Sequence, residues 1–385
     1  QRPAAGDRRR IDHTPKVHSA TVSGERPTAT RVVTRAWRAA RLALGLLLFV
    51  GALQLMKTAA AGLSILQSGI LVENVGTALG LGWLGALLVL SGSPVAATAL
   101  ALVAGGEHGS SSFSELQGFA MLTGSRLGAA FVVLLTAVIW ALREGKGRRA
   151  APLSTAVLAL TGTAIVYVPA AVIGLLLLTR TPFQHLDARL PAQFVDVIDL
   201  VYGDLVTHAK QWPPGVTFAL ALATLLVAFK VIDTVLPTLD EQSLGPRVLW
   251  LQRKWPMFAL GSLVALVTMS VSVALTVLVP LVARGRVRRE NILPYIFGAN
   301  ITTLGDTMLA AFALDSPSAV RIVLAEVIAT TTVSLVILTC FYTQVRRGLW
   351  TFQRSVLAST LNLALFTLGL FAVPVAAIAL SATVF

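Results

Sequence analysis

Long apolar stretches dominate the chain, and most of them are long enough to cross a lipid bilayer. A helix needs about 20 apolar residues to span roughly 30 Å of hydrocarbon. Stretches of this kind predict about seven full spans, at 42–66, 116–142, 152–179, 215–237, 291–314, 319–344 and 355–382. Two further apolar stretches, 80–104 and 256–283, are interrupted near their middles. The pattern therefore predicts an all-α polytopic membrane protein with two broken segments.

Polar or helix-breaking residues form the two interruptions. The first is Ser91–Gly92–Ser93–Pro94, and the second is Thr268–Met269–Ser270–Val271–Ser272. Non-helical backbone at membrane depth is tolerated where it is buried in protein or lines a wet cavity. Each broken stretch is therefore interpreted as a re-entrant helical hairpin. The alternative is an ordinary span with a kink, which would give nine continuous helices.

Loop charges favour the hairpins, because positive residues flank the cytoplasmic ends of membrane helices. The second broken stretch has a basic cluster before it and another after it, made of Arg253, Lys254, Arg284, Arg286, Arg288 and Arg289. Both of its ends are therefore expected inside. The loop 105–115 after the first broken stretch carries Glu107 and Glu115 but no Lys or Arg, and is expected outside. Nine continuous spans would leave one arginine cluster on the wrong side.

The remaining loops fit a chain whose N-terminus is cytoplasmic. Residues 42–179 and 213–345 then form two transmembrane repeats of opposite orientation, each with one hairpin, and 346–385 holds a last span. The acidic segment 180–212 is expected outside, where apolar residues at helical spacing indicate an interfacial helix. Inverted repeats with broken helices recur in transporters, with the substrate site at the repeat interface.

Charge is concentrated at the start of the chain. The sequence is 55% hydrophobic and 13% charged, with a net charge of +13, and residues 1–41 are rich in Arg, Pro, Thr and Ser. This composition is typical of a disordered basic cytoplasmic arm. The arm could only set the topology, or it could bind anionic lipid headgroups. Nucleic acid is not expected as a partner, because no folded basic module follows the arm. The expected location is the plasma (inner) membrane.

No motif indicates an enzyme. Walker, GxSxG and HExxH patterns are missing from the sequence, and its five histidines do not cluster with the single cysteine, Cys340. A disulfide framework is excluded, and no metal or cofactor other than a sodium ion is expected.

Polar side chains inside the spans are the candidate site, because they are costly at membrane depth unless they line a cavity or find partners. Hydroxyls, an amide and a guanidinium can replace the water around an oxyanion. The substrate-binding candidates are Ser91, Ser93, Arg126, Ser270, Ser272, Asn300 and Thr303, and the ion-coupling candidates are Thr302, Asp306 and Thr307. Asn300, Thr303 and Thr307 fall on one helical face, with Asp306 one residue off. Ordinary helix packing is the alternative for each Ser and Thr.

The sequence leaves more than one role for each of two acidic residues, Asp306 and Glu326. Asp306 is interpreted as a sodium or proton site, or as a counter-ion to Arg126. Glu326, with Thr330 one turn further on, is a secondary candidate, and the alternative is that its side chain snorkels to the membrane surface or forms a structural pair.

Two segments resemble motifs of a transporter family. Residues 46–56, LLLFVGALQLM, are similar to its opening helix, and Ile296–Phe297–Gly298–Ala299–Asn300–Ile301–Thr302–Thr303 resembles its GANIGTT helix start. The family is that of the sodium/phosphate cotransporters, the bacterial relatives of type II sodium-dependent phosphate symporters. The resemblance covers most of 42–345. It implies sodium-coupled uptake of inorganic phosphate, or of a similar small oxyanion, by alternating access.

The sequence departs from this family at the hairpin tips. Family members carry a QSSS motif at each tip, implicated in binding sodium and phosphate, but the two Gln positions fall here near Ser91 and Met269. In the first repeat the counterpart of GANIG is Gly124–Ser125–Arg126–Leu127–Gly128, with Arg126 where the family has Asn. Protons are therefore an alternative to sodium as the coupling ion.

Two other functions are also open. The missing glutamines favour a non-transporting module that assembles with a partner membrane protein, and a homo-dimer is a further form of assembly. The basic arm and Arg126 favour a translocator of lipids or lipid phosphates.

Overall fold

The computed structural model describes residues 28–62, 74–107, 113–143, 150–187, 191–235, 253–283, 287 and 289–383. The chain divides into two units, residues 1–40 and 41–385. In the first unit, residues 28–40 are helical and begin α1 (Thr28–Gly62), although they were expected to belong to the basic arm. Residues 1–27 of that arm lie outside the described residues, and its expected lipid contacts stay a prediction.

Helices make up all the regular structure of the described residues, which confirms the predicted all-α class. After α1 the first group is α3 (Val75–Val89), α4 (Ser93–Glu107), α5 (Glu115–Ala129), α6 (Phe131–Arg143), α7 (Ala150–Thr179), α8 (Thr181–Gln184), α9 (Ala192–Ala209) and α10 (Pro214–Val235). The second group is α11 (Lys254–Thr268), α12 (Val271–Ala283), η3 (Arg289–Asn291), α13 (Ile292–Thr302), α14 (Leu304–Ala313), α15 (Pro317–Val336), the π-helical turn η4 (Ile337–Phe341), α16 (Tyr342–Leu357) and α17 (Thr360–Thr383).

Six helical segments in the described part of the chain are long and apolar enough to cross a membrane. They are Ala36–Gly62, Glu115–Arg143, Ala150–Thr179, Pro214–Val235, Pro317–Leu357 and Thr360–Ser381. Few side chains of the last segment are buried, and large apolar side chains such as Leu361, Leu368 and Leu380 are exposed. Apolar surface on this scale needs lipid or another protein to cover it. The chain is therefore a multi-pass membrane protein, as its apolar pattern predicts.

One expected span, 291–314, is two helices in the structure, so six long spans are found where seven were expected. Helix α13 ends at Thr302 and α14 begins at Leu304. In a continuous helix the carbonyl of Asn300 would accept the N–H of Leu304. Here it accepts the hydroxyls of Tyr167, at 2.9 Å, and of Thr303, at 3.2 Å. Side chains that enter the backbone ladder in this way interrupt a helix.

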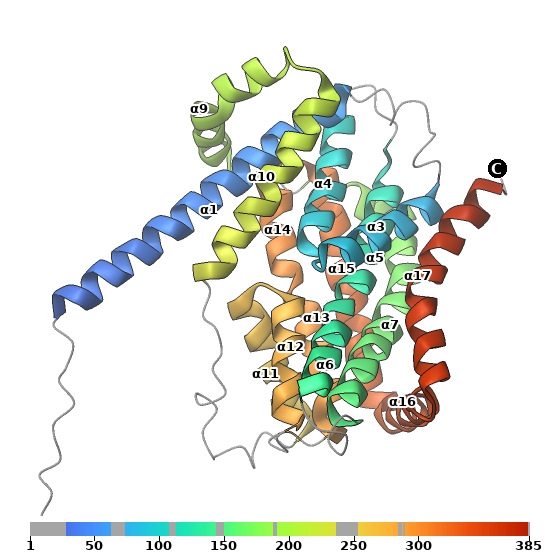
Figure 1. Ribbon diagram of the computed structural model, residues 1–385. Helices are drawn as coiled ribbons and strands as arrows, with labels where there is room; N and C mark the ends of the chain where they lie inside the picture. The colour runs from blue at the N-terminus through green and yellow to red at the C-terminus, as the bar shows by residue number, and fades with distance from the viewer. Residues whose placement is uncertain are drawn as a thin grey trace, which may run out of the picture. The chain divides into compact units, whose positions relative to one another are not determined.

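The boundaries of the last two expected spans also differ. Helices α15 and α16 and the turn η4 between them form one segment of 41 residues. A straight helix of that length would measure about 60 Å, roughly twice the hydrocarbon thickness. Figure 1 shows α16 nearly end-on while α17 lies along its length, so the chain changes direction between α16 and α17. The last span accordingly begins at Thr360, after α16, and not at residue 355.

Both interrupted stretches break where the sequence predicts. Helix α3 is followed by Leu90 with φ 58°, and α11 is followed by Met269 with φ 45°, both in the left-handed region. Non-glycine residues occupy that region rarely. The hydroxyl of Ser272 donates to the carbonyl of Leu90 at 3.4 Å, so the two breaks meet. In Figure 1, α3 and α4 lie in the upper half of the view and α11 and α12 in the lower half.

Matching glycines bring α3 against α5 and α11 against α13. A Cβ added to Gly82 would lie 2.0 Å from the carbonyl oxygen of Met121, and one added to Gly261 would lie 2.0 Å from that of Tyr295. Gly82 precedes Leu90 by the same number of residues as Gly261 precedes Met269. The two helix pairs therefore share one mode of close packing.

The partner helices repeat this pattern from the other side. A Cβ on Gly124 of α5 would lie 2.1 Å from the carbonyl oxygen of Leu79, and one on Gly298 of α13 would lie 2.1 Å from that of Phe258. Small residues allow membrane helices to approach this closely. Arg126 and Asn300 each follow one of these glycines by two residues, so the contacts hold both candidate side chains in place.

Local capping starts two helices that carry candidate residues. Helix α5 begins after Ser114, whose hydroxyl accepts the backbone N–H of Gln117 while the Gln117 side chain accepts the N–H of Ser114. Helix α15 begins after Ser316, whose hydroxyl accepts the N–H of Ala319 at 3.1 Å. Such caps satisfy N–H groups that the first turn of a helix leaves without partners.

Candidate functional site

A buried ion pair joins the two halves of the chain. Arg126, in the last turn of α5, is 1% exposed, and its Nη2 lies 3.4 Å from Oδ1 of Asp306 on α14, which is 5% exposed. Arg126 also donates to the hydroxyl of Thr307, and that hydroxyl contacts Asp306 Oδ1 at 2.8 Å. The structure therefore contains the counter-ion contact expected as one alternative for Asp306. Pairing offsets the large cost of burying either charge.

The polar groups around this pair are not fully satisfied. Four buried atoms lack a hydrogen-bond partner, namely Arg126 Nε, Asp306 Oδ2, Asn300 Oδ1 and Glu326 Oε1. A buried polar atom without any partner costs about 1–3 kcal/mol, and each of these four has bonding capacity that no described protein group uses. One atom is a guanidinium donor and three are acceptors. The cluster can therefore take both an anion and a proton or cation.

Asn300 lies where the helix breaks. Its side-chain Nδ2 donates to Thr163 Oγ1 at 3.4 Å, and its carbonyl accepts the hydroxyls of Tyr167 and Thr303. Thr163 and Tyr167 lie one turn apart on α7 and are buried. Neither was among the candidates, although two polar side chains at this spacing inside an apolar span were a signal.

Glu326, the secondary candidate, lies in the middle of α15 and is 0% exposed. Its Oε2 lies 2.9 Å from the hydroxyl of Thr123, a residue of α5 that the sequence did not single out. The hydroxyl of Thr330, one turn further on, donates to the backbone carbonyl of Glu326 at 2.6 Å. Thr123 lies three residues before Arg126, and both side chains therefore lie on one face of α5.

The serines of the two breaks are half-buried and lie beside this cluster. A Cβ on Gly92, between Ser91 and Ser93, would come within 2.9 Å of the carbonyl oxygen of Ser125, which precedes Arg126. At the second break, Ser270 Oγ accepts the N–H of Val273 at 3.3 Å, and Ser272 contacts the first break. The Gly92 contact places the first break next to Arg126, and the Ser272 bond connects the second break to the first.

Thr302 does not join the other two ion-coupling candidates. Its hydroxyl donates to the carbonyl of Ser262 at 2.7 Å and approaches that of Gly298 at 3.2 Å, which ties α13 to α11. Asp306 and Thr307 instead contact Arg126. The structure thus separates Thr302 from Asp306 and Thr307.

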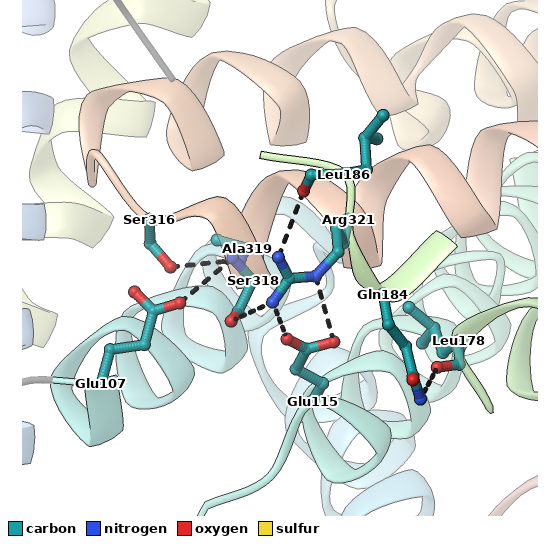
Figure 2. Close-up of polar contacts among 9 residues, drawn as sticks. All are labelled: Glu107, Glu115, Leu178, Gln184, Leu186, Ser316, Ser318, Ala319 and Arg321. Carbon is teal, nitrogen blue, oxygen red and sulfur yellow. Dashed lines mark hydrogen bonds and ion pairs between the residues drawn. The ribbon is translucent and has the colours of Figure 1, made fainter. Parts of the chain in front are cut away.

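A second polar cluster surrounds Arg321 near the start of α15 (Figure 2). The guanidinium contacts both carboxylate oxygens of Glu115, the carbonyl of Leu186 at 3.2 Å and the hydroxyl of Ser318 at 2.9 Å. Glu107 accepts the N–H of Ser318 at 3.1 Å. A cavity of about 530 Å³ lies here, lined by Glu107, Gln184, His185, Asp187, Asp315, Pro317 and Arg321. Sequence reasoning used Glu107 and Glu115 only as topology markers. It missed Arg321 as the partner of Glu115 and the backbone of Ser318 as the partner of Glu107.

Comparison with family models, with curated proteins and with solved structures finds no match to this chain.

Proposed function

We propose that the protein is a secondary transporter that takes up inorganic phosphate, or a similar small oxyanion, across the plasma membrane with its N-terminus in the cytoplasm. The observation that carries this proposal is the buried Arg126–Asp306 pair, which keeps an unpartnered guanidinium N–H and an unpartnered carboxylate oxygen beside two helix breaks. A donor and an acceptor that no described protein group occupies can bind the groups of a solute and of a coupling ion.

The proposed architecture has two inverted repeats, with α3–α4 and α11–α12 as re-entrant hairpins. The matching glycine contacts and the left-handed residue at each break support it. Packing between the two repeats supports this architecture as well, because α5 of the first repeat packs on α15 of the second, and α13 of the second packs on α7 of the first. Transporters of this kind bind solute where the repeats meet.

In the proposed mechanism the oxyanion replaces Asp306 at Arg126. A guanidinium presents a planar fork that suits phosphate oxygens, and Thr307 and Asn300 add a hydroxyl and an amide. Asp306 is then released and becomes available to a sodium ion or a proton. Solute and coupling ion would thus bind together, and the half-buried serines of the breaks would line the approach as the two halves rock.

Uptake of labelled phosphate into proteoliposomes tests this function. Accumulation driven by a sodium gradient or by a proton gradient is the expected result. No accumulation with either gradient, together with stable co-purification of a membrane partner, would favour a non-transporting module. Density for an acyl chain beside Arg126 would favour a lipid translocator.

Removing the hydroxyl of Tyr167 should impair transport by more than its effect on stability explains. Tyr167→Phe takes away the bond to the Asn300 carbonyl, at a net cost of about 0.5–1.5 kcal/mol. Tyr295→Phe is the matched control, because Tyr295 is equally buried and its hydroxyl donates to the carbonyl of Ala274 at 2.8 Å. Thermal unfolding in detergent should be similar for both variants, while uptake should fall only in Tyr167→Phe. Equal uptake by the two variants would remove Tyr167 from the site.

Cysteine labelling tests the second hairpin. In a Cys340→Ser background, cysteines at Arg253 and Arg289 should both react from the cytoplasmic side, because the stretch between them enters and leaves on one face. Cys340 must be replaced because it is exposed. A cysteine at Glu107 should react from outside and serves as the control. Labelling of residues 253 and 289 from opposite sides would contradict the hairpin.

A further inference from the structure

The carboxyl of Glu326 is buried inside a candidate span without a cation of its own. Arg126 is the nearest basic side chain on α5, and its contacts go to Asp306 and Thr307. The titratable or charged side chains on α15 itself and on the elements packed against it are Glu107 on α4, Glu115 and Arg126 on α5, Tyr167 on α7, Tyr295 on α13, Asp306 on α14, Arg321 on α15 and Cys340 on η4. Of the two arginines, Arg321 pairs with Glu115 at the start of α15. An ionised carboxyl in this position would be strongly disfavoured.

Counting hydrogens at Thr123 shows which form of Glu326 fits. The hydroxyl oxygen of Thr123 lies 2.9 Å from Glu326 Oε2 and 3.0 Å from the carbonyl oxygen of Phe119. A carboxylate and a carbonyl both only accept, and one hydroxyl has a single hydrogen to donate. With Glu326 ionised, one of these two close contacts would therefore have no hydrogen in it. With Glu326 protonated, its O–H donates to Thr123 and Thr123 donates to Phe119, so both contacts are hydrogen bonds.

We propose that Glu326 is a proton-binding site, and that in the transport cycle proposed above its carboxyl takes up one proton on one side of the membrane and releases it on the other. The first half of this inference rests on the contacts of Glu326 alone. The second half rests on the proposed function, and it makes the proton a coupling ion.

Arg126 links the proton to the anion. Thr123, which holds the carboxyl, and Arg126 lie one turn apart on α5. A protonated Glu326 leaves the positive charge of Arg126 to an entering oxyanion, whereas an ionised Glu326 would compete for that charge. Proton and anion therefore favour each other's binding, and this coupling is reciprocal.

Infrared spectroscopy of the purified full chain tests the proton site without any transport. At neutral pH the wild type should show the carbonyl band of a protonated carboxyl, and Glu326→Gln should lose that band. Glu290→Gln, which changes an exposed carboxyl, is the matched control and should keep it. A wild type without the band, or a Glu326→Gln variant that retains it, would overturn the proton site.

A second variant covers the case in which Glu326→Gln does not fold. Thr123→Val removes the hydroxyl that accepts from the carboxyl while keeping a similar shape. It should shift the carbonyl band to higher frequency, because the protonated group loses its hydrogen bond. An unshifted band would show that the protonated carboxyl is not the one beside Thr123.

Transport then separates the proton site from the proposed function. Glu326→Gln should lose the stimulation of phosphate uptake by a pH gradient but keep exchange of phosphate at equal concentrations, since glutamine mimics the protonated form. Unchanged stimulation would overturn the coupling role. A wild type that neither accumulates nor exchanges phosphate while showing the carbonyl band would defeat the proposed function and leave the proton site standing.

Discussion

Replacement of Arg126 by alanine is expected to abolish phosphate uptake. The variant removes the one guanidinium of the buried cluster and leaves Asp306 without its cation. Removing one partner of a buried pair costs about 3–5 kcal/mol, so a loss of folded protein must be separated from a loss of transport. Uptake per mole of folded protein in proteoliposomes is the measurement, with the folded fraction taken from size-exclusion chromatography.

Two further variants make this separation. Arg126→Ala combined with Asp306→Ala leaves no uncompensated charge, so stability should recover relative to the single variant while uptake stays lost. Arg321→Ala is the matched control, because Arg321 forms a partly exposed pair with Glu115 away from the cluster. The contacts of Arg321 go to Glu115, Leu186 and Ser318 and not to the cluster around Arg126, so uptake per mole of folded protein should be close to wild type. Normal uptake by the double variant would show that the Arg126–Asp306 pair is only structural.

A single methyl group at Gly298 is expected to destabilise the protein severely. The added Cβ would lie 2.1 Å from the backbone carbonyl oxygen of Phe258 and 2.9 Å from the backbone N of Ser262. These atoms belong to α11 and cannot turn aside as a flexible side chain could, so α11 and α13 must separate. Overpacking of this kind typically costs about 1–3 kcal/mol, occasionally more. Because α13 also carries Asn300, uptake should fall with stability.

Gly369→Ala is the matched control for this variant. Gly369 is also helical, and a Cβ there would meet no atom within 4 Å. That change should be neutral or should stabilise the helix by roughly 0.5–1 kcal/mol. Thermal unfolding in detergent compares the two variants. A melting temperature of Gly298→Ala equal to that of the wild type would show that α11 and α13 are not packed as closely as described.

Several features of the site followed from the sequence for local reasons. The helix breaks at 91–94 and 268–272 were predicted because polar residues in an apolar run, with glycine and proline at the first break, disfavour a continuous helix. Arg126 and Asp306 were recognised because charge is rare at membrane depth. Their mutual contact was one of the alternatives, and a bond across 180 residues of sequence was needed to select it.

Other features had no comparable local signal. The bond between Thr123 and Glu326 joins residues 203 apart, and neither spacing nor composition relates them. The division of the expected span 291–314 follows from the hydroxyl of Tyr167, which arrives from α7 and occupies the carbonyl of Asn300. The contact of Thr302 also had no local signal, because its hydroxyl donates to the carbonyl of Ser262 on α11, whereas Asp306 and Thr307 contact Arg126.

Hydropathy and helix-breaking residues act over one or two turns of chain, so class, spans and breaks could be read along the sequence without reference to any other part of the molecule. Partners of buried polar groups are different, because a membrane interior offers no water and each group must find whatever lies across the helix interface. The packing of distant helices therefore decided that Asp306 pairs with Arg126, that the carboxyl of Glu326 contacts the hydroxyl of Thr123, and that the span 291–314 is divided. Close contacts such as that of Gly298 with Phe258 set this packing.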